Sequence, residues 1–309
     1  MNPTSLLQRA GPISSKAAIV AFDVILFVSL AAQLAIIAIV RVARLERMKT
    51  WYLLLVSGVM FSFSFVFLVG HQTGPEPPLN YCTFSAGLIY AAPPMTAAAA
   101  LFLVIELHLR LSSTLYGTKI SDKFIYWAFG IVMLSQALPF WTALFVGLSD
   151  PSMIQRDPSG LYCHVAGSKV PTLLTGTILI LCVSIMFFME ASTVYHLLRQ
   201  RKNVKPIKVQ VRASDFPYHL FVRTLLYTLA AGFAVVAAVV MNLYDDNVSV
   251  NLVPIIPVSV AVVFGTQQDM LRIIFCCRGR RVLANTADVN RVPDLGWKSA
   301  KKESESSPV

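Results

Sequence analysis

Four charged residues stand inside apolar stretches of the chain, where an unpaired charge is costly. They are Asp23, Glu106, Glu190 and Arg223. Arg110 follows Glu106 by four residues, the favourable order for an acid–base pair on one helix face. The sequence therefore predicts a Glu106–Arg110 pair and makes Arg223 a candidate partner of Glu106 or Glu190. The alternative is that Arg223 reaches lipid headgroups and Glu106 pairs only with Arg110.

The histidines do not follow the spacing of a metal site. His108, His196 and His219 all stand at the ends of apolar stretches, and no carboxylate motif accompanies them. A retinal protein needs a lysine in its last helix, and residues 247–271 contain none. We therefore expect no metal, no cofactor and no enzymatic activity.

Long apolar stretches divide the chain, and each is long enough for a helix to cross a bilayer. Hydrophobic residues make up 56% of the chain and charged residues 14%, against roughly 25% charged in soluble domains. This composition predicts an all-α membrane protein with a bundle of seven transmembrane helices. The basic residues between the stretches fit lipid headgroups better than nucleic acid. The predicted spans are 17–40, 51–70, 83–107, 124–148, 171–198, 220–243 and 248–265.

The positive charge between these spans gives the orientation, because cytoplasmic loops retain lysine and arginine. The loops after the first, third, fifth and seventh spans, with the tail, hold 21 of the 26 basic residues, and the other side holds four. We therefore expect the N-terminus outside the cell and the C-terminus in the cytoplasm. The expected parts are an extracellular tail at 1–16, a bundle with a juxtamembrane helix at 17–277, and a disordered cytoplasmic tail at 278–309.

The cysteines fall into two groups in this topology. Cys82 and Cys163 lie outside the cell, where oxidising conditions allow a disulfide. We expect these two to be bonded, with two free thiols as the alternative. Cys276 and Cys277 end the segment 264–277, whose apolar residues recur at helical spacing. This segment predicts an amphipathic eighth helix along the membrane with two palmitoylation sites, unless the seventh helix simply continues.

These features together resemble the G-protein-coupled receptor superfamily. Within it, FGTQQDMLR (264–272) and the third-span sequence CTFSAGLIYAAPPMTAAAALFLVIELHLRL (82–111) look like fungal orphan and pheromone-receptor-like receptors. Glu106, His108 and Arg110 stand where rhodopsin-like receptors have an adjacent acid–Arg–Tyr triplet. The resemblance implies a plasma-membrane receptor that couples an extracellular small-molecule or lipid-like ligand to a heterotrimeric G protein.

Two groups of residues are candidates for the sites of such a receptor. The switch and G-protein coupling residues lie toward the predicted cytoplasmic surface. The ligand-pocket candidates lie in the outer and middle thirds of their spans, and interhelical hydrogen bonding is the alternative role for each. The switch candidates are Glu106, His108, Arg110, Glu190 and Arg223, and the pocket candidates are Tyr90, Met95, Gln136, Trp141, Asn242, Tyr244 and Asn251.

A small-solute membrane transporter is the main alternative function. A transporter needs ionisable groups near the membrane midplane and often has broken helices. The buried charges of this chain do not cluster at the midplane. However, Pro93 and Pro94 are expected to break the third helix, which favours the transporter.

The topology can be tested with epitope tags. A tag after Val309 is expected to stain only permeabilised cells, and a tag at residues 1–16 is expected to stain intact cells, because the basic loops stay in the cytoplasm. Flow cytometry with and without permeabilisation measures both. Staining of the C-terminal tag on intact cells would contradict the charge argument.

Overall fold

The chain, described by a computed structural model, is built mainly from apolar helices. The structure describes residues 16–116, 121, 123–203, 222, 224–230, 232–233 and 255–266, and of residues 114–116 and 197–203 only the backbone. Five helices among these residues are long and apolar enough to cross a membrane, which indicates a membrane-embedded protein. They are α2 (Lys16–Val42), α3 (Lys49–Val66), α4 (Leu79–Tyr116), α5 (Lys123–Ser149) and α6 (Val170–Asn203), and a shorter apolar helix, α8, spans Ile255–Gly265.

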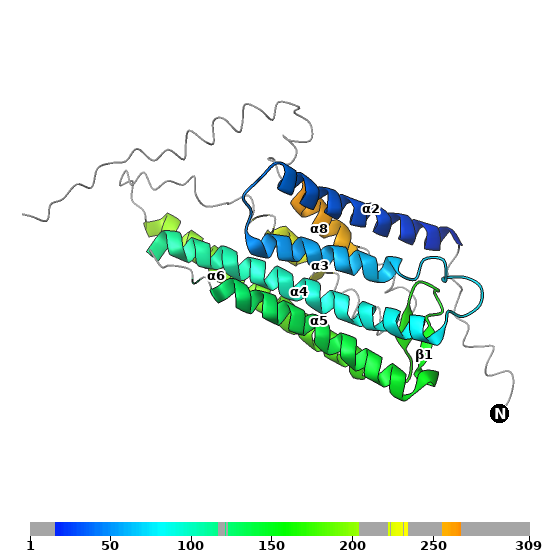
Figure 1. Cartoon of the computed structure of the whole chain (residues 1–309). Helices are drawn as coiled ribbons and strands as arrows, with labels where there is room; N and C mark the ends of the chain where they lie inside the picture. Colours follow the sequence, from blue (N-terminus) through cyan, green and yellow to red (C-terminus); the bar gives the residue numbers. More distant parts are fainter. Residues whose placement is uncertain are drawn as a thin grey trace, which may run out of the picture. The chain divides into compact units, whose positions relative to one another are not determined.

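Helix α4 lies at the centre of these helices, and consecutive long helices run antiparallel (Figure 1). It packs against α3, α5 and α6, while α8 packs against α2 and α3. In the most apolar stretch of α4, 78% of the residues are buried, compared with 28% in α5 and 17% in α6. Helices α3, α5 and α6 are therefore arranged around α4, and α2 and α8 pack against α3.

The two ends of this bundle differ in chemistry. Near the start of α4, Cys82 is bonded to Cys163, as the sequence predicts, and the Cα atoms lie 5.5 Å apart. We call this the disulfide end. Glu106 lies about 24 residues further along α4, or roughly 36 Å at 1.5 Å per residue. We call the end that contains Glu106 the acid end.

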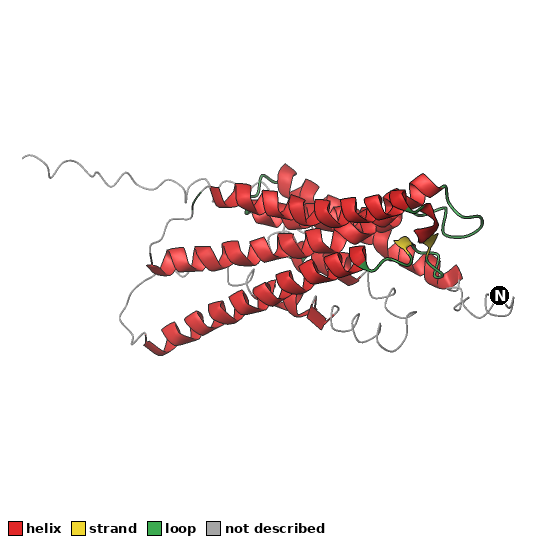
Figure 2. Ribbon diagram, turned by 90° about the horizontal axis from the view of Figure 1, so that it is seen from below, coloured by secondary structure: helices red, strands yellow, loops and turns green. Residues whose placement is uncertain are grey.

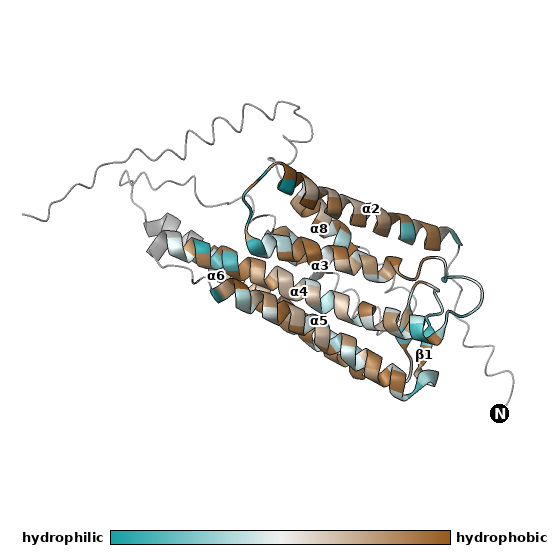
Figure 3. Cartoon of the chain, viewed as in Figure 1, coloured by the Kyte–Doolittle hydropathy of each residue, from teal (hydrophilic) through white to brown (hydrophobic). Residues whose placement is uncertain are grey.

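Large apolar side chains cover the outward faces of α2, α5 and α6. Phe27, Phe145 and Phe188 expose 45%, 61% and 72% of their surface. Figure 3 shows these hydrophobic faces in brown, with polar residues gathered toward the helix ends. Lipid tails solvate such faces as well as another apolar helix would. The exposed faces are therefore compatible with a bilayer.

Helix α4 passes through Pro93 and Pro94 without a break, so the expectation of a broken third helix is wrong. Pro94 has no N–H to donate to the carbonyl four residues earlier, which is that of Tyr90. Thr175 Oγ1 of α6 donates to this carbonyl at 3.0 Å. A side chain of a neighbouring helix thus replaces the missing backbone bond, as happens at other prolines in transmembrane helices.

A buried amide joins α2, α3 and α8. Gln33 of α2 is fully buried, and its Nε2 donates to the Pro257 carbonyl of α8 at 2.8 Å. Gly58 of α3 leaves room for the amide, because a Cβ at this position would lie 2.9 Å from Gln33 Oε1. This hydrogen bond joins α8 to α2, and Gly58 lets α3 pack closely beside it.

The segment between α5 and α6 forms a short hairpin at the disulfide end (Figure 2). It begins with a 3-10 turn at Pro151–Met153, and β1 (Ile154–Arg156) then pairs antiparallel with β2 (Cys163–Val165). Gly160 between the strands has a φ of +77°, and a Cβ there would lie 2.6 Å from the carbonyl oxygen of Gln72. Glycine alone fits this close approach without strain.

The helix ends differ from the predicted span ends at several places. Helix α4 begins at Leu79, four residues before the predicted start, and α6 ends at Asn203, five residues after the predicted end. The sequence predicts a polar loop from residue 108, but α4 continues to Tyr116. The loss of apolar residues marks where a helix leaves the hydrocarbon, and the helix itself can continue into water. Helix α3 ends at Val66, four residues before the predicted end. Helical residues 224–230 and α8 fall within the predicted sixth and seventh spans, whose remaining parts lie outside the described residues.

The bond from Thr175 to α4 predicts a stability effect. Replacing Thr175 by valine removes the only hydroxyl donor that the structure gives the Tyr90 carbonyl, at an expected cost of about 1 kcal/mol. Thermal unfolding of the purified chain in detergent measures this loss. Thr177→Val is the matched control, because the exposed Thr177 donates only within its own helix, to Leu173. Equal unfolding temperatures for the two variants would contradict the bridging role.

Candidate functional site

Glu106 is a buried acid with a donor at each oxygen. It exposes 5% of its surface. Its Oε1 accepts from Arg110 Nε at 3.0 Å and Nη2 at 2.7 Å, so the predicted pair is formed. Its Oε2 accepts from Thr50 Oγ1 of α3 at 2.6 Å. This carboxylate therefore links α3 to α4.

Glu190 of α6 is a second buried acid, with fewer donors. It exposes 2% of its surface. Its Oε1 accepts from Thr228 Oγ1 at 2.8 Å, which joins α6 to the helical residues 224–230. Its Oε2 is buried without a hydrogen-bond partner in the part of the chain that the structure describes. Glu190 therefore has one carboxylate oxygen that lacks a donor among the described residues.

Two histidines approach each other between α4 and α6. The ring centres of His108 and His196 are 6.4 Å apart. His108 Nδ1 lies 2.8 Å from Thr193 Oγ1 of α6. The sequence places both histidines at helix ends, and the structure places them beside one another.

These contacts form a polar layer between helices at the acid end. The layer joins α3 to α4, α4 to α6, and α6 to residues 224–230, each through a threonine hydroxyl. Three of the five predicted switch residues belong to this layer, namely Glu106, His108 and Glu190. A fourth, Arg110, pairs with Glu106. The fifth, Arg223, lies outside the described residues. We call the following residues the acid-end layer: Thr50, Glu106, His108, Glu190, Thr193 and Thr228.

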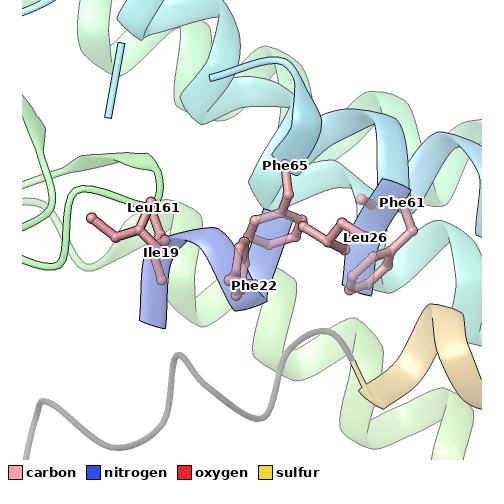
Figure 4. Packing of buried hydrophobic residues seen from close by; sticks show 7 residues of the cluster. Ile19, Phe22, Leu26, Phe61, Phe65 and Leu161 are labelled. Carbon is pink, nitrogen blue, oxygen red and sulfur yellow. The ribbon is translucent and has the colours of Figure 1, made fainter. Parts of the chain in front are cut away.

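The disulfide end is closed by the hairpin. Leu161, between the two strands, exposes 1% of its surface and packs in one cluster with Ile19 and Phe22 of α2 and Phe65 of α3 (Figure 4). Gln72 lies in the loop after α3, and its Nε2 donates to Asp23 Oδ1 of α2 at 2.7 Å. The loop between α5 and α6 is thus anchored in the bundle by an apolar side chain as well as by the disulfide.

Arg156 and His164 give the hairpin its electrostatic character. The two terminal nitrogens of Arg156 donate to the carbonyls of His71, Gly74 and Pro75, at 2.9 to 3.3 Å. Burial lowers the pKa of His164, and the Asp157 carboxylate, 3.9 Å away, opposes that change. Through its bonds to these three carbonyls, the Arg156 guanidinium ties the hairpin to the loop after α3.

The described pocket candidates differ in burial and in their contacts. Tyr90 accepts the Val165 N–H of β2 at 3.3 Å through its hydroxyl, and Met95 is buried within α4. Gln136 is half-buried on α5, and Trp141 exposes 50% of its surface. The remaining candidates Asn242, Tyr244 and Asn251 lie outside the described residues, as do the lipidation candidates Cys276 and Cys277.

An apolar groove follows the seam between α2 and α8. It has a volume of about 720 Å³, and Ser259 is the one polar side chain among the residues that line it. The groove begins at Ala18 and Ile255 and continues along the seam as a second groove that reaches Ala32 and Thr266. An apolar ligand could lie along this seam.

Sequence reasoning missed the residues that complete the acid-end layer. Thr50, Thr193 and Thr228 are buried threonines in apolar helices, where a hydroxyl usually bonds its own backbone. A buried acid needs a donor at its own depth, and this requirement was the signal that could have pointed to them. Leu161 carried no signal, because an apolar residue in a polar loop is common.

In comparisons with known proteins, no family model matches the chain, and no curated protein matches it significantly. The function of the chain must therefore be inferred from its residues and their arrangement. The acid-end layer connects α3, α4, α6 and residues 224–230 through hydrogen bonds between polar side chains.

The Thr50–Glu106 contact predicts a stability effect that depends on the hydroxyl. Thr50→Val preserves the side-chain volume but leaves a buried carboxylate oxygen without its donor, at an expected cost of about 1–3 kcal/mol. Thr50→Ser is the control, because serine retains the donor. Thermal unfolding of the purified chain should separate the two variants. Valine and serine variants of equal stability would show that this hydrogen bond is dispensable.

Proposed function

We propose that this chain is a seven-helix receptor of the plasma membrane, with its N-terminus outside the cell and its C-terminus in the cytoplasm. It couples an extracellular small-molecule or lipid-like ligand to a heterotrimeric G protein. The distribution of lysine and arginine supports this orientation and assigns the acid end to the cytoplasm. The basic loops on that side also suit a protein partner and anionic lipid headgroups.

The contact between Glu190 and Thr228 is the observation that carries the proposal. It is the charged link between α6 and the helical residues 224–230, and it lies at the end of the bundle that has no covalent restraint among the described residues. A receptor must open a binding surface on the cytoplasmic side while its outer side holds together. Reversible bonds at the acid end and a disulfide at the other end suit this requirement.

The Thr228 hydroxyl is suited to a two-state contact. It has one proton and two acceptors within reach, Glu190 Oε1 at 2.8 Å and the Thr224 carbonyl at 3.1 Å. When residues 224–230 move away from α6, the proton can bond to the carbonyl of its own helix. The hydroxyl then remains satisfied, so the open state costs less than a broken hydrogen bond would. Arg223, five residues before Thr228, remains a proposed partner of Glu190.

The ligand class that we propose follows from the packing at the disulfide end and from the groove between α2 and α8. Leu161 fills the space between α2 and α3 at the disulfide end, and Tyr90 is bonded to β2. The groove of about 720 Å³ between α2 and α8 is apolar apart from Ser259. These features favour a lipid-like or small hydrophobic ligand that approaches from the membrane.

The transporter alternative has lost the feature that favoured it. Its main support was a break at Pro93 and Pro94, and α4 is continuous there. The buried acids Glu106 and Glu190 are both bonded to threonines at one end of the bundle. A transport path needs such groups along the membrane depth.

The proposal predicts a gain of basal activity in Thr228→Val. This variant lacks the hydroxyl that joins α6 to residues 224–230, so the resting population should shift toward the open state. Ligand-independent nucleotide exchange is expected to rise severalfold on a co-expressed G protein that the wild-type chain activates. Membranes from cells that express each G-protein class, treated with cell extracts and nutrients, identify that partner.

Thr228→Ser is the matched control, because it retains the donor and should leave basal exchange at the wild-type value. Surface expression of each variant is measured in parallel. Unchanged exchange in Thr228→Val, with a coupled G protein and normal expression, would rule out this contact as the restraint. Failure of the wild-type chain to activate any G-protein class under any treatment would count against the receptor itself.

A further inference from the structure

The pair His108 and His196 has a use that the receptor proposal does not require. His108 lies on α4 and His196 on α6, both half-buried at the acid end, with ring centres 6.4 Å apart and an interplanar angle of 59°. His196 makes no hydrogen bond within the described part of the chain. Its nitrogens are thus available to a further ligand.

The Thr193 hydroxyl lies within hydrogen-bond distance of both the Met189 carbonyl and His108 Nδ1. The hydroxyl has one proton, which it can donate to the Met189 carbonyl at 2.8 Å. When it does so, Thr193 Oγ1 accepts a hydrogen from His108 Nδ1, which lies 2.8 Å away. Nδ1 then carries the hydrogen, and the neutral ring has its lone pair on Nε2. No hydrogen bond to Nε2 occurs among the described residues.

This arrangement is the one that metal-binding histidines adopt. A ligating imidazole donates its other ring N–H to a neighbouring oxygen, which holds the ring in position and makes the free nitrogen more basic. Thr193 provides that oxygen for His108.

We propose that His108 and His196 bind one divalent transition-metal ion of the zinc type between α4 and α6. Two imidazoles bound to Zn²⁺ at about 2 Å have ring centres roughly 5 Å apart, so rotation of the side chains by about 1 Å closes the pair. The described residues contain no group of three His, Cys, Asp or Glu that could hold a metal. Among the described residues, these two imidazoles would hold the ion between the two helices as an exchangeable ligand.

The test uses the full-length chain, purified in detergent, with Zn²⁺ alone as the probe. Cys276 and Cys277 are first changed to serine, because thiolates bind zinc strongly. Binding is measured by competition with a fluorescent zinc chelator at neutral pH. The expected result is one bound ion, with affinity lower by about tenfold or more in both His108→Ala and His196→Ala.

Three further variants separate a bridging site from general zinc binding. His71→Ala, at the disulfide end, should keep the affinity of the parent chain. Thr193→Val removes the oxygen that orients His108 and should weaken binding by about tenfold, whereas Thr193→Ser should not. His196→Ala keeps the test valid if His108→Ala fails to fold, since His196 has no hydrogen bond to lose within the described residues. No zinc binding by the parent chain, or unchanged affinity in His196→Ala, would overturn the proposal. Binding at this pair does not depend on G-protein coupling.

Discussion

The burial of α4 on nearly every side is the constraint from which the other contacts follow. A helix surrounded by helices cannot expose its polar groups to water, so each group needs a partner within the bundle. The carbonyl of Tyr90 is bonded by Thr175, and the carboxylate of Glu106 by Thr50 and Arg110. Each partner on another helix fixes the rotation and depth of that helix relative to α4.

The two ends of the bundle are held by bonds of different kinds. The disulfide joins residues 81 positions apart, and a bond of this kind contributes about 2–4 kcal/mol by restricting the unfolded chain. It cannot be exchanged for another contact in the folded state. The hydrogen bonds of the acid-end layer contribute about 1 kcal/mol each, and each can be replaced by another donor or acceptor. A rearrangement that leaves the fold intact therefore begins at the acid end.

The sequence was sufficient for contacts within one helix and for contacts that topology imposes. The Glu106–Arg110 pair follows from the four-residue spacing alone. The disulfide between Cys82 and Cys163 follows because the charge-based topology leaves two cysteines on one side. Five of the predicted spans correspond to five helices that are long and apolar enough to cross a membrane.

Contacts between helices could not be predicted in the same way, because they depend on how each helix is rotated about its axis. Thr50 and Thr228 became partners of acids only through that rotation. The continuity of α4 at Pro94 likewise depends on Thr175 of a distant span. A proline shows which backbone bond is lost, but the residue that replaces it is a property of the packed bundle.

The threonines of the acid-end layer make its interhelical contacts adaptable. Thr228 can redirect its O–H from Glu190 to the Thr224 carbonyl, and Thr193 Oγ1 lies 2.8 Å from both the Met189 carbonyl and His108 Nδ1. Neither hydroxyl is left with an unpaired proton when the helices separate. The cost of separation falls on the buried carboxylate of Glu190, which must find another donor or take up a proton. In the receptor that we propose, the layer holds residues 224–230 against α6 for as long as Thr228 donates to Glu190.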